Sequence, residues 1–358
     1  MTIAYKSIKG LRAIKALNTN PKTDSDATLY DALKKNLVNY VVPANLSWKD
    51  PEANMVLSDK SLLVEKLGQR QKRIFMEPYE NMKCTLPESV ISKCELFIHN
   101  FNKANITNMS RNIVHDKTWK ENISTLEKRA EPVRFGIIRG FENSTTRKEQ
   151  SEGTYITDVV MPLLRASLED MPNGKTCLSI AERQSLASKV RRNSGDISKE
   201  RMGKKPDAML LMKHGGKINE LAYAECSRII CNDTKKANDE VKLWRETLDG
   251  ISFVNLVCRP LSNQFGIVGV QVAGEDIYLN ILVNDAGGLS RYFHIDHAEI
   301  PLTKSTRKVK SLLRLLLTLR NITIVNKSLL VQALEQATSH PPRNVNPSPT
   351  VSTPPYNK

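Results

Sequence analysis

The stretch GKKPDAMLLMKHGGKINELAYAECS, residues 203–227, decides the fold class of this 358-residue chain. Two apolar runs flank a loop that contains Gly215 and Gly216, a pattern that predicts a β-hairpin. Asp207 stands at the start of the first predicted strand, and Glu225 stands near the end of the second. Because the start of one hairpin strand lies beside the end of the other, we expect the two carboxylates to converge.

The segments around this hairpin predict helices and further strands in alternation. A helix before the hairpin is expected at residues 153–170, with Pro162 as a possible kink, and a helix after it at residues 234–250, ending at Gly250. This order is typical of an α/β domain, in which helices pack on a sheet. The remaining predicted elements are a hairpin that turns at residues 274–276, a strand at 290–302, and one or two closing helices between 305 and 337.

Three parts are expected along the chain. Residues 1–130 predict a helical extension, and residues 131–335 predict the sheet domain, starting with a strand at 131–140. Residues 336–358 are rich in Pro, Ser and Asn and predict a disordered tail.

The extension contains apolar residues at helical spacing but no motif with chemical meaning. Leu29, Leu33 and Leu37 predict one helix, and a second is expected to begin with Ser58 as its cap and to run until Pro78. The extension is therefore expected to pack on the sheet domain or to bind a protein partner.

The composition indicates a polyanionic partner. Lys and Arg number 53 against 38 Asp and Glu, a net charge of +15. Such a surplus favours nucleic acid, DNA or RNA, over a membrane, and no run approaches the roughly 18 apolar residues of a membrane span. The first residues do not resemble a secretory signal, and the six cysteines form no CxxC pair. An intracellular location, cytoplasmic or nuclear, is expected.

Part of the positive charge lies directly before Asp207. A single basic cluster is more often a solvated face, but a second cluster follows at residues 304–320, and two clusters around one candidate site favour contact with phosphates. The residues of the first cluster that we expect to bind nucleic acid are Arg183, Lys189, Arg191, Arg192, Arg201, Lys204 and Lys205.

Pro206-Asp207, a spacer of 17 residues and Glu225-Cys226-Ser227 together resemble the PD-(D/E)xK nuclease superfamily. The resemblance implies a restriction-endonuclease-like fold, a mixed sheet flanked by helices, and hydrolysis of phosphodiester bonds with Mg²⁺. It also implies that Asp207, Glu225 and the backbone carbonyl of Cys226 hold the metal, and that Glu152 on the preceding helix assists. The wider stretch is similar to fungal proteins that carry this domain.

The motif departs from the family at one position. The family has a lysine where this chain has Ser227, and a hydroxyl cannot replace the positive charge that stabilises the transition state. Lys235, Lys236 and Lys242 on the following helix are candidate substitutes. Two hypotheses therefore stay open: an active nuclease, or an inactive nucleic-acid-binding or protein-interaction module on the same fold.

His294 and His297 bracket Asp296, a pattern that occurs at metal and acid–base sites. In a strand, His294 and His297 point to opposite faces, so a structural or surface role is favoured. The sequence contains no phosphate-binding glycine motif and no GxSxG or HExxH motif.

Overall fold

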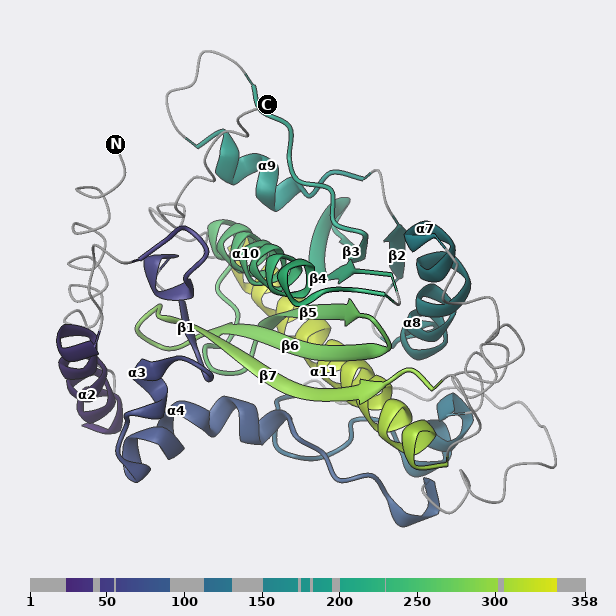
Figure 1. Ribbon diagram of the computed structural model, residues 1–358, viewed down its shortest axis with the longest axis horizontal. Helices are drawn as coiled ribbons and strands as arrows, with labels where there is room; N and C mark the ends of the chain where they lie inside the picture. The colour runs from purple at the N-terminus through teal and green to yellow at the C-terminus, as the bar shows by residue number, and fades with distance from the viewer. Residues whose placement is uncertain are drawn as a thin grey trace.

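The computed structural model describes residues 24–40, 46–54, 56–90, 113–130, 151–172, 175–180, 183–194, 200–228, 230–301 and 306–339. A mixed sheet of seven strands, in the order β1-β7-β6-β5-β4-β3-β2, forms the centre of the molecule. Helix α10 covers one face of this sheet and helix α11 covers the other (Figure 1). The predicted α/β class, a mixed sheet flanked by helices, is confirmed.

Two strand pairs are parallel, β4 with β5 and β1 with β7, and all other pairs are antiparallel. The strands are β1 (Val56–Ser58), β2 (Thr176–Ile180), β3 (Ala208–His214), β4 (Lys217–Cys226), β5 (Gly266–Ala273), β6 (Asp276–Asn284) and β7 (Ser290–Glu299).

The two predicted hairpins are confirmed. Gly215 and Gly216 join β3 to β4 with φ values of 55° and 77°, and Gly274 joins β5 to β6 with φ of 68°. This left-handed region is strained for residues that have a Cβ atom, which explains the glycines. The predicted strand at 290–302 is also present, as β7.

The helix predicted before the hairpin is present but interrupted. Helix α7 (Glu152–Tyr155) passes through a π-helical turn, Ile156–Val160, into helix α8 (Met161–Leu168). Pro162 lies in the first turn of α8, where its missing N–H group is tolerated. The π-helical turn therefore connects α7 directly to α8, so the backbone stays helical up to and beyond Pro162.

Helix α10 (Asp233–Val257) is longer than predicted, because Gly250 does not end it. The glycine lies against β4: a Cβ atom at this position would stand 2.8 Å from the hydroxyl of Tyr223. The role of Gly250 is thus close packing of the helix on the sheet, and the predicted stop was wrong.

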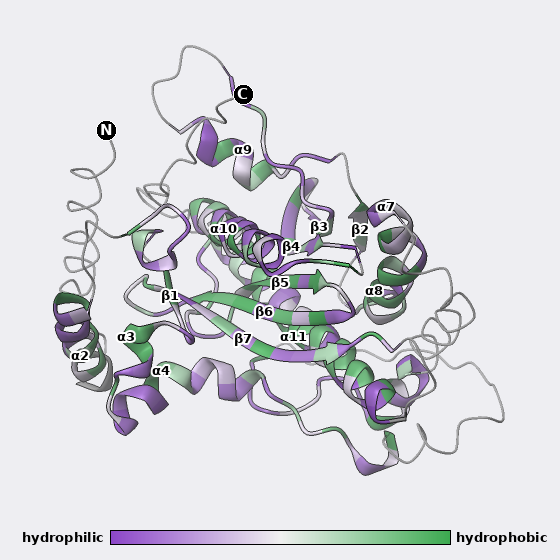
Figure 2. Cartoon of the chain, in the orientation of Figure 1, coloured by the Kyte–Doolittle hydropathy of each residue, from purple (hydrophilic) through white to green (hydrophobic). Residues whose placement is uncertain are grey.

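Of the one or two closing helices that were expected, the structure has one, α11 (Thr306–Ser339). Its buried face is a run of leucines, and Figure 2 shows hydrophobic green along β5, β6 and the middle of α11.

None of the helices in the described ranges is long and apolar enough to cross a membrane. Because α11 continues to Ser339, the predicted tail is helical at its start, and residues 340–358 lie outside the described residues.

The N-terminal part contains more than helices. Strand β1 adds to the edge of the sheet beside β7, so Ser58 ends a strand and does not cap a helix. Pro78 lies inside a helix and does not end it. The strand predicted at 131–140 lies outside the described residues. The helices of this part include α2 (Asp24–Tyr40), α3 (Leu62–Glu65) and α4 (Gln69–Met82), with a 3₁₀ helix at Pro51–Asn54, and residues 88–90 and 123–130 are also helical.

Candidate active site

The β3–β4 hairpin brings Asp207 and Glu225 together at one end of the sheet. Ala208 pairs with Ala224, so the residue before β3 lies beside the last residues of β4. The Oδ2 atom of Asp207 accepts a hydrogen bond of 2.7 Å from the backbone N–H of Cys226. This contact holds Asp207 next to the strand position that carries Glu225.

The two carboxylates influence each other's ionisation. Glu225 is only 5 % exposed, and its burial, together with the charge of Asp207, raises its pKa to about 7. Burial also raises the pKa of Asp207, with a further contribution from Glu152. Because burial and like charges both penalise the ionised form, the site favours an added positive charge.

Lys242 of α10 supplies one such charge. Its Nζ atom lies 3.3 Å from Oε2 of Glu225 and 2.7 Å from Oδ1 of Asp239. Burial works against the charged form of Lys242, but the two carboxylates outweigh it and raise its pKa. The ammonium group is therefore a fixed cation at the buried carboxylate.

Asp239, which the sequence did not single out, links the strand to the helix. It is 0 % exposed, and its carboxylate accepts hydrogen bonds from Ser227 Oγ at 2.6 Å and from Lys235 Nζ at 3.2 Å. Burial opposes its ionisation, but the bonds from Lys242, Ser227 and Lys235 outweigh burial and lower its pKa. The signal in the sequence was lysine at both i−4 and i+3, which resembles an ordinary solvated helix face.

Some of the other predicted site residues contact this cluster and others do not. Lys235 approaches Glu152 of α7, with 4.0 Å between Nζ and Oε2, and the Glu152 side chain is 41 % exposed. Lys236 points away, because its Nζ atom binds the Tyr278 hydroxyl on β6 at 2.6 Å. Of the three substitute lysines, Lys242 alone has an ion pair with Glu225 among the described residues.

The oxygen atoms present are of the kind that Mg²⁺ prefers, and two adjacent carboxylates with raised pKa values, one buried and one half-buried, suit a divalent cation. Within the described part of the chain, no group of three or more His, Cys, Asp or Glu side chains is arranged to hold a metal. The carboxylate pair therefore fits a magnesium ion only if backbone oxygen or water completes its coordination.

The basic residues before Asp207 have several kinds of environment. Lys189 forms an ion pair of 2.8 Å with Glu200, and Arg191 forms one with the buried Asp249 of α10. Burial lowers the pKa of Lys204. Arg183, Arg201 and Lys205 are exposed and Arg192 is half-buried.

Helix α9 (Leu186–Arg192) and the segment that leads to Asp207 lie side by side, in the upper part of Figure 1. The backbone N–H of Ser185 donates to the carbonyl of Lys204 at 2.8 Å, and Arg201 exchanges hydrogen bonds with Asn193. These hydrogen bonds hold the segment that leads to Asp207 against the end of α9 and the residues that flank it.

Three residues of the second basic cluster, at 304–320, are engaged in internal contacts. Arg320 is fully buried and forms an ion pair of 2.7 Å with Glu121, and Lys308 pairs with Glu299. Arg314 binds Asp296 through two nitrogen atoms, at 2.9 and 3.0 Å. The expectation that both clusters serve phosphate contact thus loses much of its support from the second one.

His294 has the structural role that the sequence favoured, but the prediction that His294 and His297 point to opposite faces was wrong. A register shift between β6 and β7 pairs His294 with Asn280 and His297 with Tyr278, so both side chains lie on the face that α10 covers. Its ring nitrogens contact Asp59 Oδ1 at 2.5 Å and Glu240 Oε1 at 3.0 Å, so it joins the segment after β1 to α10. His297 stacks on the ring of Tyr278, with 6.0 Å between the ring centroids.

No protein-family model matches the chain, and no curated protein and no solved structure matches it. Its function must therefore be inferred from the carboxylate pair, the lysine beside it and the surrounding charge.

Proposed function

We propose that the chain hydrolyses phosphodiester bonds of nucleic acid with the help of a divalent metal. The observation that carries the proposal is the pair of the half-buried Asp207 and the buried Glu225, with the ammonium group of Lys242 3.3 Å from Oε2 of Glu225. Two carboxylates and a lysine are the groups that the PD-(D/E)xK motif combines, and the helix that carries Glu152 precedes the strands, as the resemblance implies.

The residues have distinct roles in this proposal. Asp207, Glu225 and the backbone carbonyl of Cys226 would hold Mg²⁺, with Glu152 as an assisting carboxylate. When bound, such an ion polarises a phosphoryl oxygen and activates a water molecule. Lys242 offsets the negative charge that develops on the phosphate, and Asp239 positions Lys242.

Lys242 also bears on the missing motif lysine. Ser227 cannot supply a charge, but its hydroxyl donates to Asp239, the same carboxylate that holds Lys242. The serine and the lysine are thus two parts of one hydrogen-bonded group. This arrangement favours an active site over a degenerate one, because the positive charge is retained at Glu225.

The alternative is a module on the same fold that binds nucleic acid without cutting it. One observation favours it: Lys242 already neutralises Glu225, so the site is stable without a metal. The exposed Arg183, Arg201 and Lys205 would then provide the affinity, which falls as salt increases.

The test is cleavage of plasmid DNA, single-stranded DNA and single-stranded RNA with Mg²⁺ or Mn²⁺. We expect Asp207→Asn and Glu225→Gln to lower the rate at least about 100-fold, and both to abolish the rise in Tm that the metal alone gives the wild type. Asp233→Asn, an exposed carboxylate at the start of α10, is the control and should change neither. Cleavage that is unchanged in the two site variants would falsify the assignment. Salt-sensitive binding without cleavage by the wild type would select the alternative.

A further inference from the structure

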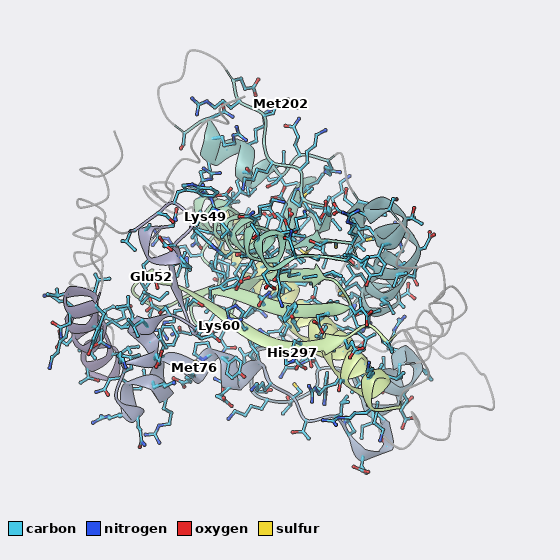
Figure 3. The ribbon with its side chains drawn as sticks, in the orientation of Figure 1. Lys49, Glu52, Lys60, Met76, Met202 and His297 are labelled. Atoms are coloured by element: carbon cyan, nitrogen blue, oxygen red, sulfur yellow. The ribbon has the colours of Figure 1, made fainter. Side chains whose placement is uncertain are left out.

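A cavity of about 730 Å³ lies along the part of β7 that β1 does not reach. Strand β1 pairs only with Ser290–Tyr292, and the cavity is lined by the following residues of β7, by β6, by the segments after β1 and α4, and by α11. Figure 3 shows Lys60 and His297 of its wall between the sheet and α4.

Part of the cavity wall lies at the same end and on the same face of the sheet as the carboxylate pair, whereas Arg314 and Thr318 of α11 line it from the opposite face. Glu225 pairs with Gln271, Gln271 with Tyr278, and Tyr278 with His297, so these four residues form one row across β4, β5, β6 and β7. Residues paired in register point to the same face. Three strand spacings separate the ends of this row, about 14 Å, and its last two residues line the cavity.

The wall of the cavity carries more positive than negative charge. Lys60, Lys83 and Arg314 line it against the single carboxylate of Asp296, which Arg314 binds. Among the described residues, Lys60 and Lys83 form no ion pair, although the charge of Lys60 helps to lower the pKa of Asp59 and of Glu240. Both ammonium groups can therefore contact an anionic ligand in the cavity.

Aromatic rings lie beside these cations. Tyr278 and His297 stack with an interplanar angle of 18°, and Lys83 Nζ lies 4.0 Å from the ring centroid of Tyr79. Proteins that bind single-stranded nucleic acids stack the bases on aromatic rings and contact the phosphates with nearby cations.

A buried acceptor in the wall lacks a donor. Asn280 of β6 is 1 % exposed, and its Oδ1 atom has no hydrogen-bond partner within the described residues. A buried amide oxygen without a donor is unfavourable by roughly 1–3 kcal/mol. A ligand with an amino or hydroxyl group would satisfy it, and a nucleotide has such donors on its base and its ribose.

We propose that this cavity binds one unpaired nucleotide of the strand whose backbone reaches Asp207 and Glu225. Lys60 and Lys83 contact its phosphate, the Tyr278–His297 pair stacks on its base, and Asn280 accepts a hydrogen bond from its base or ribose. The inference deepens the proposed function and rests on it for the identity of the ligand as nucleic acid. An unpaired nucleotide fits because a cavity of this volume at a sheet edge admits a single base and not a duplex.

The test measures binding of adenosine 5′-monophosphate, adenosine and inorganic phosphate to the full chain by NMR, in EDTA so that no metal is present. We expect the nucleotide to bind at least about tenfold more tightly than either fragment, because both the phosphate and the base are held. The double variant Lys60→Ala/Lys83→Ala should weaken nucleotide binding about tenfold. Lys66→Ala/Lys72→Ala, which removes two exposed lysines of α3–α4 outside the cavity wall, is the matched control and should not.

Asn280→Leu provides a test that does not depend on charge. Because Oδ1 has no partner in the described residues, the substitution should leave Tm nearly unchanged or raised and should weaken nucleotide binding several-fold. Equal affinity in the wild type, Asn280→Leu and the double lysine variant would overturn the inference, as would phosphate that competes as well as the nucleotide.

The two proposals can fail separately. Nucleotide binding measured in EDTA does not require cleavage, so a wild-type protein that binds the nucleotide but cleaves none of the substrates with Mg²⁺ or Mn²⁺ contradicts hydrolysis and supports the cavity. Metal-dependent cleavage of single strands that is unaffected by Lys60→Ala/Lys83→Ala and by Asn280→Leu contradicts the cavity alone.

Discussion

The position of a single lysine distinguishes this site from the motif that its sequence resembles. In the motif a lysine follows the Glu by two residues, and here Ser227 stands at that position with 1 % exposure. Its hydroxyl and the ammonium group of Lys242 bind the two oxygens of one carboxylate, Asp239. A lysine at 227 would thus compete with Lys242 for Asp239, which explains why the chain has one of them and not both.

This geometry predicts that the lysine can be exchanged between the two positions. We expect Lys242→Ser to lower metal-dependent cleavage ~100- to 1,000-fold, because the transition state loses its fixed charge. Ser227→Lys/Lys242→Ser should recover at least about tenfold of that loss, since the new ammonium group would lie at Asp239 in the space that Lys242 vacates.

Lys235→Ser is the control for this exchange. Lys235 binds Asp239 but has no ion pair with Glu225 among the described side chains, and it is 40 % exposed. Its loss should reduce cleavage less than about tenfold. A Lys242→Ser variant that cleaves at the wild-type rate would show that the charge at Glu225 is not used.

At the level of secondary structure, α10 connects most of the polar contacts around the site. Lys242 and Asp239 reach toward β4, Lys236 reaches β6, and Glu240 reaches His294 on β7. Because the helix lies across these strands, a change at one contact is expected to affect the orientation of the others.

The contact between α10, β7 and the segment after β1 predicts a pH-dependent stability. Burial disfavours protonated His294, but the bonds to Asp59 and Glu240 outweigh it and raise its pKa above 6.5. A base with a raised pKa in the folded state stabilises the fold fully below its unfolded pKa, and this stabilisation is lost as pH rises through the folded pKa. The ring should therefore stabilise the protein at pH 5.5–6 and progressively less above.

His294→Gln tests this prediction. The loss in free energy of unfolding relative to the wild type should be largest near pH 5.5–6, about 1 kcal/mol, which corresponds to a few degrees in Tm. The difference should shrink toward pH 9. His297→Gln, whose ring stacks on Tyr278 without bridging two carboxylates, should give a small difference. A difference for His294→Gln that grows with pH would contradict the assignment.

The elements that the sequence predicted correctly are those with local signals. Gly215, Gly216 and Gly274 mark the hairpin turns, and the two apolar runs beside Asp207 mark the strands that position it. By contrast, β1 has only three residues and becomes a strand through its pairing with β7, which no local pattern encodes. The prediction that Gly250 ends α10 failed for the same reason, because the contact that explains this glycine is with Tyr223, a residue distant in sequence.

The site was predictable to a similar extent. The convergence of Asp207 and Glu225 follows from hairpin pairing, whereas the choice of Lys242 over Lys236 depends on how α10 lies on the sheet. Asp239 resembles a solvent-exposed helix residue until the helix is placed over Ser227.

At the level of the whole molecule, the N-terminal part is joined to the sheet by buried polar contacts as well as by β1. The hydroxyl of Tyr30 on α2 donates to Asp285 at 2.6 Å, and Arg291 of β7 binds the same carboxylate oxygen at 2.8 Å. Arg291 also lies over the ring of Phe75 on α4. A buried charge that loses one of its partners strongly destabilises the fold, because the charge is then buried without full compensation.

These contacts predict that the chain from residue 131 onward does not fold cooperatively on its own. Removing residues 1–130 would take away Leu29, Val56 and Phe75, which are all 0 % exposed, and would uncover the part of the core on which they pack. It would also expose the edge of β7 and leave Arg291 and Asp285 open to solvent. We expect residues 131–339 to show no sharp thermal transition and rapid proteolysis. Removal of residues 340–358 alone, a segment whose composition predicts disorder, is the control and should leave Tm unchanged. A fragment 131–339 that unfolds as sharply as the full chain would support instead the division at residue 130 that the sequence suggests.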